Sequence, residues 1–129
     1  MPEAKKMKVL VVDDQPSLRA LVMTSLRQIG ISQVTQCNNG EEAFSELMYR
    51  PVNLVISDLN MPKLDGIGLL RKVRSEPSIA KTAFIMLTSR AEIDLVHEAV
   101  QLGVNNYIIK PFNFGALQSK IEAVFGKLT

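Results

Sequence analysis

Polar residues with metal-binding or nucleophilic chemistry stand at the ends of four short apolar runs in this chain of 129 residues. They are Asp13 and Asp14, then Asp58 with Asn60 two positions later, then Thr88 and Ser89, and finally Lys110 before Pro111. Carboxylates are hard oxygen ligands and usable nucleophiles, and a lysine ammonium is a compact positive charge. Together these residue types suit a hard divalent cation beside an incoming anionic group.

The three aspartates would repel one another if they met at one place. Two carboxylates a few ångströms apart repel by roughly 4 kcal/mol at an effective dielectric constant near 20, so either one stays protonated or a cation lies between them. Oxygen ligands favour Mg²⁺ over zinc or copper. Asp13, Asp14 and Asp58 with Lys110 and one Mg²⁺ carry no net charge, which leaves such a site ready for a phosphoryl group.

The apolar runs themselves are typical of strands in a parallel β-sheet. They span residues 9–12, 33–37, 53–57, 83–87 and 106–109. The first, third and fourth are almost continuously apolar, as strands buried on both faces are. The second alternates between polar and apolar residues and is predicted to lie at an edge of the sheet.

Between these runs, apolar residues recur at helical spacing. The first helix is predicted between Pro16 and Gly30, which suit a first turn and a helix end. Asp65 is expected to cap the third helix, the fourth is predicted over residues 91–102, and the last ends near Phe125. Strands that alternate with helices imply a mainly parallel sheet with helices on both faces.

In such an open α/β sheet, ligands bind outside the carboxyl ends of the strands. The polar residues that follow the four runs are far apart in the sequence, yet they should share that one edge. We therefore expect one functional site there rather than four unrelated turns and helix caps.

Composition favours a single globular domain over residues 1–129, with a core from about residue 8 to 126. The hydrophobic share of 47% and the charged share of 22% exclude a disordered tail, a collagen or a coiled coil. A net charge of +2 is too small to argue for nucleic-acid binding. Cys37 and His97 are the only cysteine and histidine, so neither a disulfide nor a zinc site is expected. We expect a soluble, cytoplasmic protein.

The chain resembles the response-regulator receiver domain, and in particular its stand-alone chemotaxis members of the CheY type. The resemblance spans about residues 8–125, and it is carried by four motifs in order: Val11–Asp14, Ser57–Pro62 with Asp65 and Gly66, Leu87–Ser89, and Asn106–Phe112. It implies a flavodoxin-like (βα)5 fold, a doubly wound parallel sheet of five strands in the order 2-1-3-4-5.

The resemblance also assigns the phosphorylation and metal roles. Asp58 would be the phosphoryl acceptor, which attacks a phosphohistidine on a partner kinase. Asp14 and Asp58 would bind Mg²⁺ directly, together with the backbone carbonyl of Asn60, and Asp13 would hold a metal-bound water.

Further roles fall on residues near the ends of the last two strands. Lys110 would pair with the phosphoryl group, Thr88 would donate a hydrogen bond to it, and the small Ser89 would leave the approach open. The resemblance also implies a cis peptide bond between Lys110 and Pro111. Tyr107 is either an edge-strand aromatic that covers the last helix or, with Thr88, a switch residue that fills the space vacated by the threonine.

Some charged residues are expected to be ordinary surface side chains. His97 is expected on a helix surface. The basic residues of the third helix and the following loop are expected to be solvated, with a kinase or phosphatase contact as the alternative; they are Arg71, Lys72, Arg74 and Lys81. Asn60 and Arg90 hold the variable positions that, by resemblance, adjust the lifetime of the acyl phosphate.

The function implied is that of a monomeric signalling switch rather than an enzyme, with self-catalysed phosphotransfer and dephosphorylation only. Its partners would be a histidine kinase, an output protein such as the flagellar motor switch, and a phosphatase, with no nucleic acid or membrane. The output protein would dock on the face made by the fourth helix, the fifth strand and the fifth helix, because no effector domain is expected in a chain of this length.

Three other functions stay open from the sequence. A phosphate sink or phosphorelay intermediate would use the same site without a motor partner. A magnesium-dependent phosphatase usually has a second aspartate two residues after its nucleophile, where this chain has Asn60. A flavin carrier of the same topology would need a phosphate-binding loop where Asp13 and Asp14 would repel phosphate.

Overall fold

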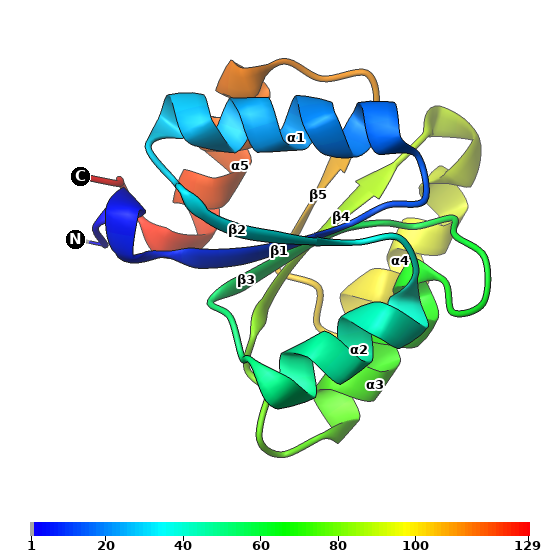
Figure 1. The fold of residues 1–129 in the computed structure, drawn as a ribbon. Coiled ribbons are helices and arrows are strands. Elements are labelled where there is room, and N and C mark those ends of the chain that lie inside the picture. Colours follow the sequence, from blue (N-terminus) through cyan, green and yellow to red (C-terminus); the bar gives the residue numbers. More distant parts are fainter. Residues whose placement is uncertain (1) are drawn as a thin grey trace.

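The computed structural model describes residues 2–129 and has one parallel sheet of five strands (Figure 1). The strands are β1 (Lys8–Val12), β2 (Gln33–Cys37), β3 (Leu54–Asp58), β4 (Ala83–Thr88) and β5 (Asn106–Ile109). Their order is β2-β1-β3-β4-β5, and all four neighbouring pairs are parallel. The predicted flavodoxin-like fold and strand order are confirmed, and β2 lies at an edge as expected.

Helices cover both faces of the sheet (Figure 1). Helices α1 (Pro16–Ile29) and α5 (Phe114–Phe125) pack on one face, and α2 (Gly40–Tyr49), α3 (Gly66–Ser75) and α4 (Ile93–Gln101) lie on the other. Short 3-10 turns, η1 (Ala4–Lys6) and η2 (Arg90–Glu92), precede β1 and α4. Within residues 2–129, no helix is both long and apolar enough to cross a membrane.

Side chains of β1 show how one strand serves two cores. Val9 and Val11 belong to the core under α1 and α5, whereas Leu10 and Val12 belong to the core under α2 and α3. Successive side chains of a strand point to opposite faces, so a strand covered on both faces must be apolar throughout. Burial of each such side chain stabilises the fold by roughly 1.5–3 kcal/mol, which explains the continuous apolar runs.

Helix ends follow the sequence signals in most places. Asp65 caps α3, because its side chain accepts a hydrogen bond from the Gly68 N–H at 2.7 Å. Gly30 ends α1 with a φ of 103°, in the left-handed region that glycine adopts without strain. The predicted start of the fourth helix is wrong: α4 begins at Ile93, because a hydrogen bond from the Glu92 N–H to the Ser89 carbonyl forms a tighter 3-10 turn first.

Arg74 differs from the solvated side chain that the sequence suggested. Its guanidinium lies half-buried at the end of α3 and donates hydrogen bonds to four acceptors. These are the carbonyls of Ala80, Thr82 and Gly103 and the side-chain oxygen of Asn105. Arg74 therefore joins α3 to the loops that precede β4 and β5, at the sheet edge opposite the polar residues.

We expect Arg74→Ala to lower the free energy of unfolding by about 2 kcal/mol, because the part-buried carbonyls of Ala80 and Thr82 and the exposed carbonyl of Gly103 lose their donor together. Lys81→Ala is the matched control, since Lys81 is an exposed basic residue of the same region. Urea denaturation followed by circular dichroism measures the free energy of unfolding of both variants. Equal stabilities of the two variants would contradict the structural role of Arg74.

Candidate functional site

The carboxyl ends of the strands bring the predicted site residues together. Asp13 follows β1, Asp58 is the last residue of β3, Thr88 is the last residue of β4, and Lys110 follows β5. A cleft of about 480 Å³ opens at this edge. Its lining includes Asp14, Asp58, Asn60, Ser89, Glu92 and Lys110.

Three carboxylates come together at this edge of the sheet. One oxygen from each of Asp13, Asp14 and Asp58 lies within 4.8 Å of the other two. Asp13 is fully buried and Asp58 is 3% exposed, whereas Asp14 faces solvent. The Oδ1 atom of Asp13 accepts a hydrogen bond from the Gln15 N–H at 2.9 Å, but its buried Oδ2 atom has no hydrogen-bond partner within residues 2–129. A buried carboxylate oxygen without a donor suits a cation.

Burial dominates the electrostatics of both buried carboxyls. Desolvation raises the pKa of Asp13 to about 6, with the Gln15 N–H opposing the shift and the charge of Asp58 adding to it. Desolvation also raises the pKa of Asp58, although the hydrogen bond and charge of Lys110 oppose it. Ionising the cluster is therefore costly unless positive charge enters the cleft.

Lys110 already supplies one positive charge. Its Nζ atom donates to Asp58 Oδ1 at 2.9 Å, and the same oxygen accepts from the Leu59 N–H at 3.0 Å. The lysine side chain is 23% exposed, so its head group faces the cleft rather than open solvent. The peptide bond between Lys110 and Pro111 is cis.

Gly66 holds the start of α3 against the acceptor strand. Its N–H donates to the Leu59 carbonyl at 2.9 Å, and a Cβ atom there would lie 2.5 Å from the Asp58 carbonyl oxygen and 2.7 Å from Met86 Sδ. Glycine is therefore required by a close backbone approach beside Asp58, which the sequence showed only as a weak start to a helix.

The two residues expected to act as a switch lie in different environments. Thr88 is fully buried, and its hydroxyl donates to the Ser89 carbonyl at 3.2 Å. Tyr107 is half-buried on edge strand β5 and packs against the core on the α2–α4 side of the sheet. The Lys120 Nζ atom of α5 lies 5.4 Å from its ring centroid.

Glu92 is a cleft residue that the sequence reasoning missed. Its Oε1 atom accepts hydrogen bonds from the Ser89 N–H at 3.1 Å and the Ser89 hydroxyl at 2.9 Å. The signal was present, because a serine followed three residues later by glutamate is the pattern of a capping box. Glu92 is thus the third carboxylate that lines the cleft, with Asp14 and Asp58.

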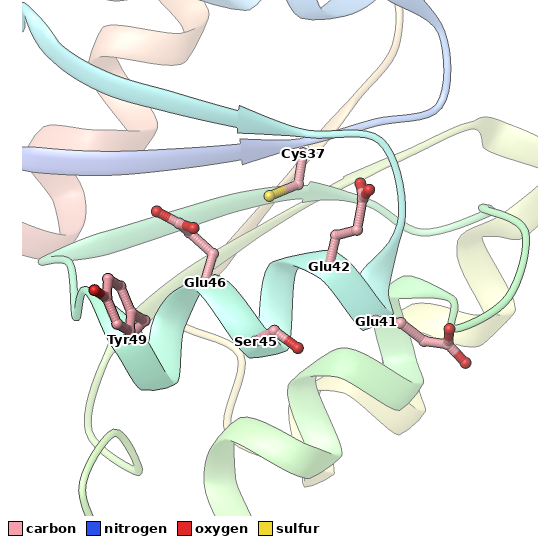
Figure 2. Close-up of a pocket in the computed structure, with 6 residues that line it drawn as sticks. All are labelled: Cys37, Glu41, Glu42, Ser45, Glu46 and Tyr49. Carbon is pink, nitrogen blue, oxygen red and sulfur yellow. The ribbon is translucent and has the colours of Figure 1, made fainter.

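A second groove, of about 670 Å³, lies between β2 and α2, away from the predicted residues. Figure 2 shows Cys37 at the end of β2 pointing towards α2, with Glu42 and Glu46 on the facing side of that helix. Burial, followed by the charges of Glu46 and Glu42, raises the pKa of the Cys37 thiol to about 11. The thiol is therefore uncharged at neutral pH and is a poor nucleophile.

Comparisons with known proteins agree on one family. The family described as the response regulator receiver domain matches residues 9–122. A probable chemotaxis protein CheY of Rhizobium etli is 48% identical over 128 residues, which are 99% of this chain and 99% of that protein.

Two solved structures extend the likeness. CheY4 of Vibrio cholerae is 30% identical with a TM-score of 0.84, over 92% of this chain and 98% of that one. The receiver domain of a sensor histidine kinase of Pseudomonas aeruginosa is 27% identical with a TM-score of 0.84, over 93% and 98% of the two chains, and holds a magnesium ion in its active-site cleft.

We expect the affinity of the cluster for Mg²⁺ to fall as the pH drops through about 6. Protons and the cation compete for Asp13, whose pKa is about 6, and for Asp58, whose pKa is also raised. Isothermal titration calorimetry at pH 5.5, 6.5 and 7.5 measures the change. An affinity that stays constant across this interval would contradict the binding of the ion by these carboxylates.

Proposed function

This chain belongs to the response regulator receiver domain family, and we propose that it is a single-domain chemotaxis regulator that is phosphorylated on Asp58. The observation that carries the proposal is the pairing of Asp58 with Lys110 at 2.9 Å, beside Asp13 and Asp14, in an open cleft. A nucleophilic carboxylate, a fixed positive charge and a cation site are the parts that phosphoryl transfer needs.

Mg²⁺ fits the donor set of the cleft. Every candidate donor is an oxygen, and the orphaned Asp13 Oδ2 atom is best explained by a cation nearby. Asp13, Asp14, Asp58 and Asn60 would hold the ion, and the likeness to the magnesium-binding receiver of Pseudomonas aeruginosa supports this assignment. When bound, the ion supplies positive charge that offsets the negative charge of the transferred group.

In the proposed reaction, a carboxylate oxygen of Asp58 attacks the phosphorus of a phosphohistidine on a kinase. A P–O bond to Asp58 forms as the P–N bond breaks, and the imidazole leaves with that electron pair and takes up a proton. The Lys110 ammonium lies 2.9 Å from Asp58 Oδ1, where it can neutralise the arriving phosphoryl oxygens. Water later attacks the acyl phosphate and releases inorganic phosphate, so the modification is reversible.

We propose a signalling switch rather than a catalyst for other substrates. A phosphatase with an aspartate nucleophile needs a further acid or base, and the residue two positions after Asp58 is Asn60, which lines the cleft but does not titrate. The cluster around Asp58 thus supports transfer to the protein itself in preference to turnover of phosphate esters.

An output surface is available beside the site. Helix α4 and the start of α5 carry large exposed apolar side chains, namely Ile93, Leu95, Val100 and Phe114. Edge strand β5, with Tyr107, lies between these two helices, which cover opposite faces of the sheet (Figure 1). We propose that a cytoplasmic output protein such as the flagellar motor switch binds here, consistent with the chemotaxis relatives.

Incubation with a small phosphodonor such as acetyl phosphate and Mg²⁺ is expected to add one phosphoryl group to the intact protein. Mass spectrometry should detect the addition, and Asp58→Asn should abolish it because an amide is not a usable nucleophile. Asp65→Asn is the control, since that carboxyl caps α3 instead. An adduct that persists in Asp58→Asn would contradict the assignment of the acceptor.

Tyr107→Ala is expected to leave phosphorylation intact and to weaken binding of the phosphorylated protein to a motor-switch peptide by about tenfold, since a receiver couples its site to its output face through a two-state change. Fluorescence anisotropy with labelled peptide measures the affinity. Tyr49→Ala is the control, because Tyr49 is 80% exposed on α2.

Unchanged affinity in phosphorylated Tyr107→Ala would exclude the switch role. If phosphorylated wild-type protein bound the peptide no better than unphosphorylated protein, a phosphate sink or phosphorelay intermediate would replace the motor-binding function.

A further inference from the structure

Glu92 is a cleft carboxylate to which the proposed reaction gives no role. It ends η2 and directly precedes α4. Its Oε1 atom accepts from the Ser89 N–H at 3.1 Å and from the Ser89 hydroxyl at 2.9 Å. Both residues line the same cleft as Asp58 and Lys110. Both hydrogen-bond donors of Ser89, its N–H and its hydroxyl, are therefore already bonded to the carboxylate of Glu92.

Ser89 lies beside the proposed phosphoryl acceptor. Strands β3 and β4 are paired so that Asp58 is opposite Leu87, and the Leu59 N–H donates to the Leu87 carbonyl at 2.9 Å. Ser89 follows two residues later at the same sheet edge. The negative charge of Glu92 also contributes to the raised pKa of Asp58, so the two carboxylates interact.

A phosphoryl group on Asp58 would bring two negative charges and three oxygens that accept hydrogen bonds. Lys110 can serve one oxygen from its present position near Asp58. Further donors that line the cleft include the N–H and hydroxyl of Ser89, and they are engaged with Glu92. Two anions cannot share these donors without like-charge repulsion in a partly buried place.

Resting on the proposed phosphorylation of Asp58, we propose that Glu92 is a positioning residue whose carboxylate competes with the phosphoryl group for the N–H and hydroxyl of Ser89. Displacement of Glu92 then carries the phosphorylation signal into the start of α4.

The link to α4 follows from chain connectivity. The 3-10 turn η2 is closed by the Glu92 side-chain bonds to Ser89 and by the hydrogen bond from the Glu92 N–H to the Ser89 carbonyl at 3.1 Å. Ile93 and Leu95, in the first turn of α4, are exposed apolar residues. Loss of the side-chain bonds frees the turn and changes how this apolar surface is presented.

Beryllofluoride with Mg²⁺, a stable analogue of an aspartyl phosphate, provides the test on the full chain. Glu92→Gln keeps an acceptor for Ser89 but removes the charge, and Glu92→Ala removes both. Asp94→Asn removes an equal charge from an exposed residue two positions away. Analogue affinity is measured by isothermal titration, and circular dichroism checks that each variant is folded.

We expect Glu92→Ala to bind the analogue about three- to tenfold more tightly than wild type, as removal of a competing hydrogen-bonded group implies. The affinity of Glu92→Gln for the analogue should lie between those of wild type and Glu92→Ala, and the affinity of Asp94→Asn should equal that of wild type. A purely structural capping role predicts the opposite sign, because a loosened site binds more weakly. Unchanged or weaker binding in Glu92→Gln would overturn the proposal.

Nuclear magnetic resonance tests the route to α4 separately. In wild type, the Ile93 amide resonance should shift on addition of the analogue, and in free Glu92→Ala it should already lie towards that shifted position. An Ile93 resonance in free Glu92→Ala that coincides with free wild type would overturn the transmission step. If wild-type protein binds no analogue at all, phosphorylation of Asp58 itself is refuted, and the role of Glu92 falls with it.

Discussion

The burial of two like charges side by side is the constraint on which the rest of this structure depends. Asp13 is fully buried and Asp58 nearly so, and desolvation raises the pKa of both. Lys110 and the Leu59 N–H compensate one oxygen of Asp58, and the Gln15 N–H compensates one oxygen of Asp13. The second oxygen of Asp13 has no such partner within residues 2–129. The fold thus keeps negative charge in excess, and that excess makes the cleft suited to a cation.

A parallel sheet is well suited to holding such a cluster in place. The backbone of Asp58 is fixed by ladder pairing with β4, by the Leu59 bond to Leu87 and by the close approach of Gly66. Because these are backbone interactions inside a packed core, the backbone of Asp58 cannot move away to reduce the repulsion. Rigid strands therefore maintain the unfavourable arrangement, while the loops beyond them leave the cleft open to solvent.

The sequence predicted the residues whose positions depend on strand ends. Asp13, Asp14, Asp58, Asn60 and Lys110 could be assigned to one edge because each follows an apolar run, and parallel strands end together. Contacts between elements that are distant in sequence could not be predicted in the same way. Arg74 looked like one more surface base, since its acceptors belong to loops that only the packing of α3 brings near. The role of Gly66 depends on a close approach to β3 that no local pattern encodes.

A conformational switch requires that its ligand interact differently with two states. The hydrogen bonds around Ser89 in this structure are those that a phosphoryl group would have to replace. The Thr88 hydroxyl donates to the Ser89 carbonyl, and both Ser89 donors contact Glu92. These bonds satisfy buried or partly buried groups without any phosphoryl group, so they stabilise the resting arrangement of the segment that joins β4 to α4. In the proposed switch, a phosphoryl group would drive a change by offering better partners to the same donors. If Asp58 is phosphorylated as proposed, its chemistry would reach the surface of α4 through a segment of five residues, Thr88 to Glu92, in which the polar side chains of Thr88, Ser89 and Glu92 have partners in this structure.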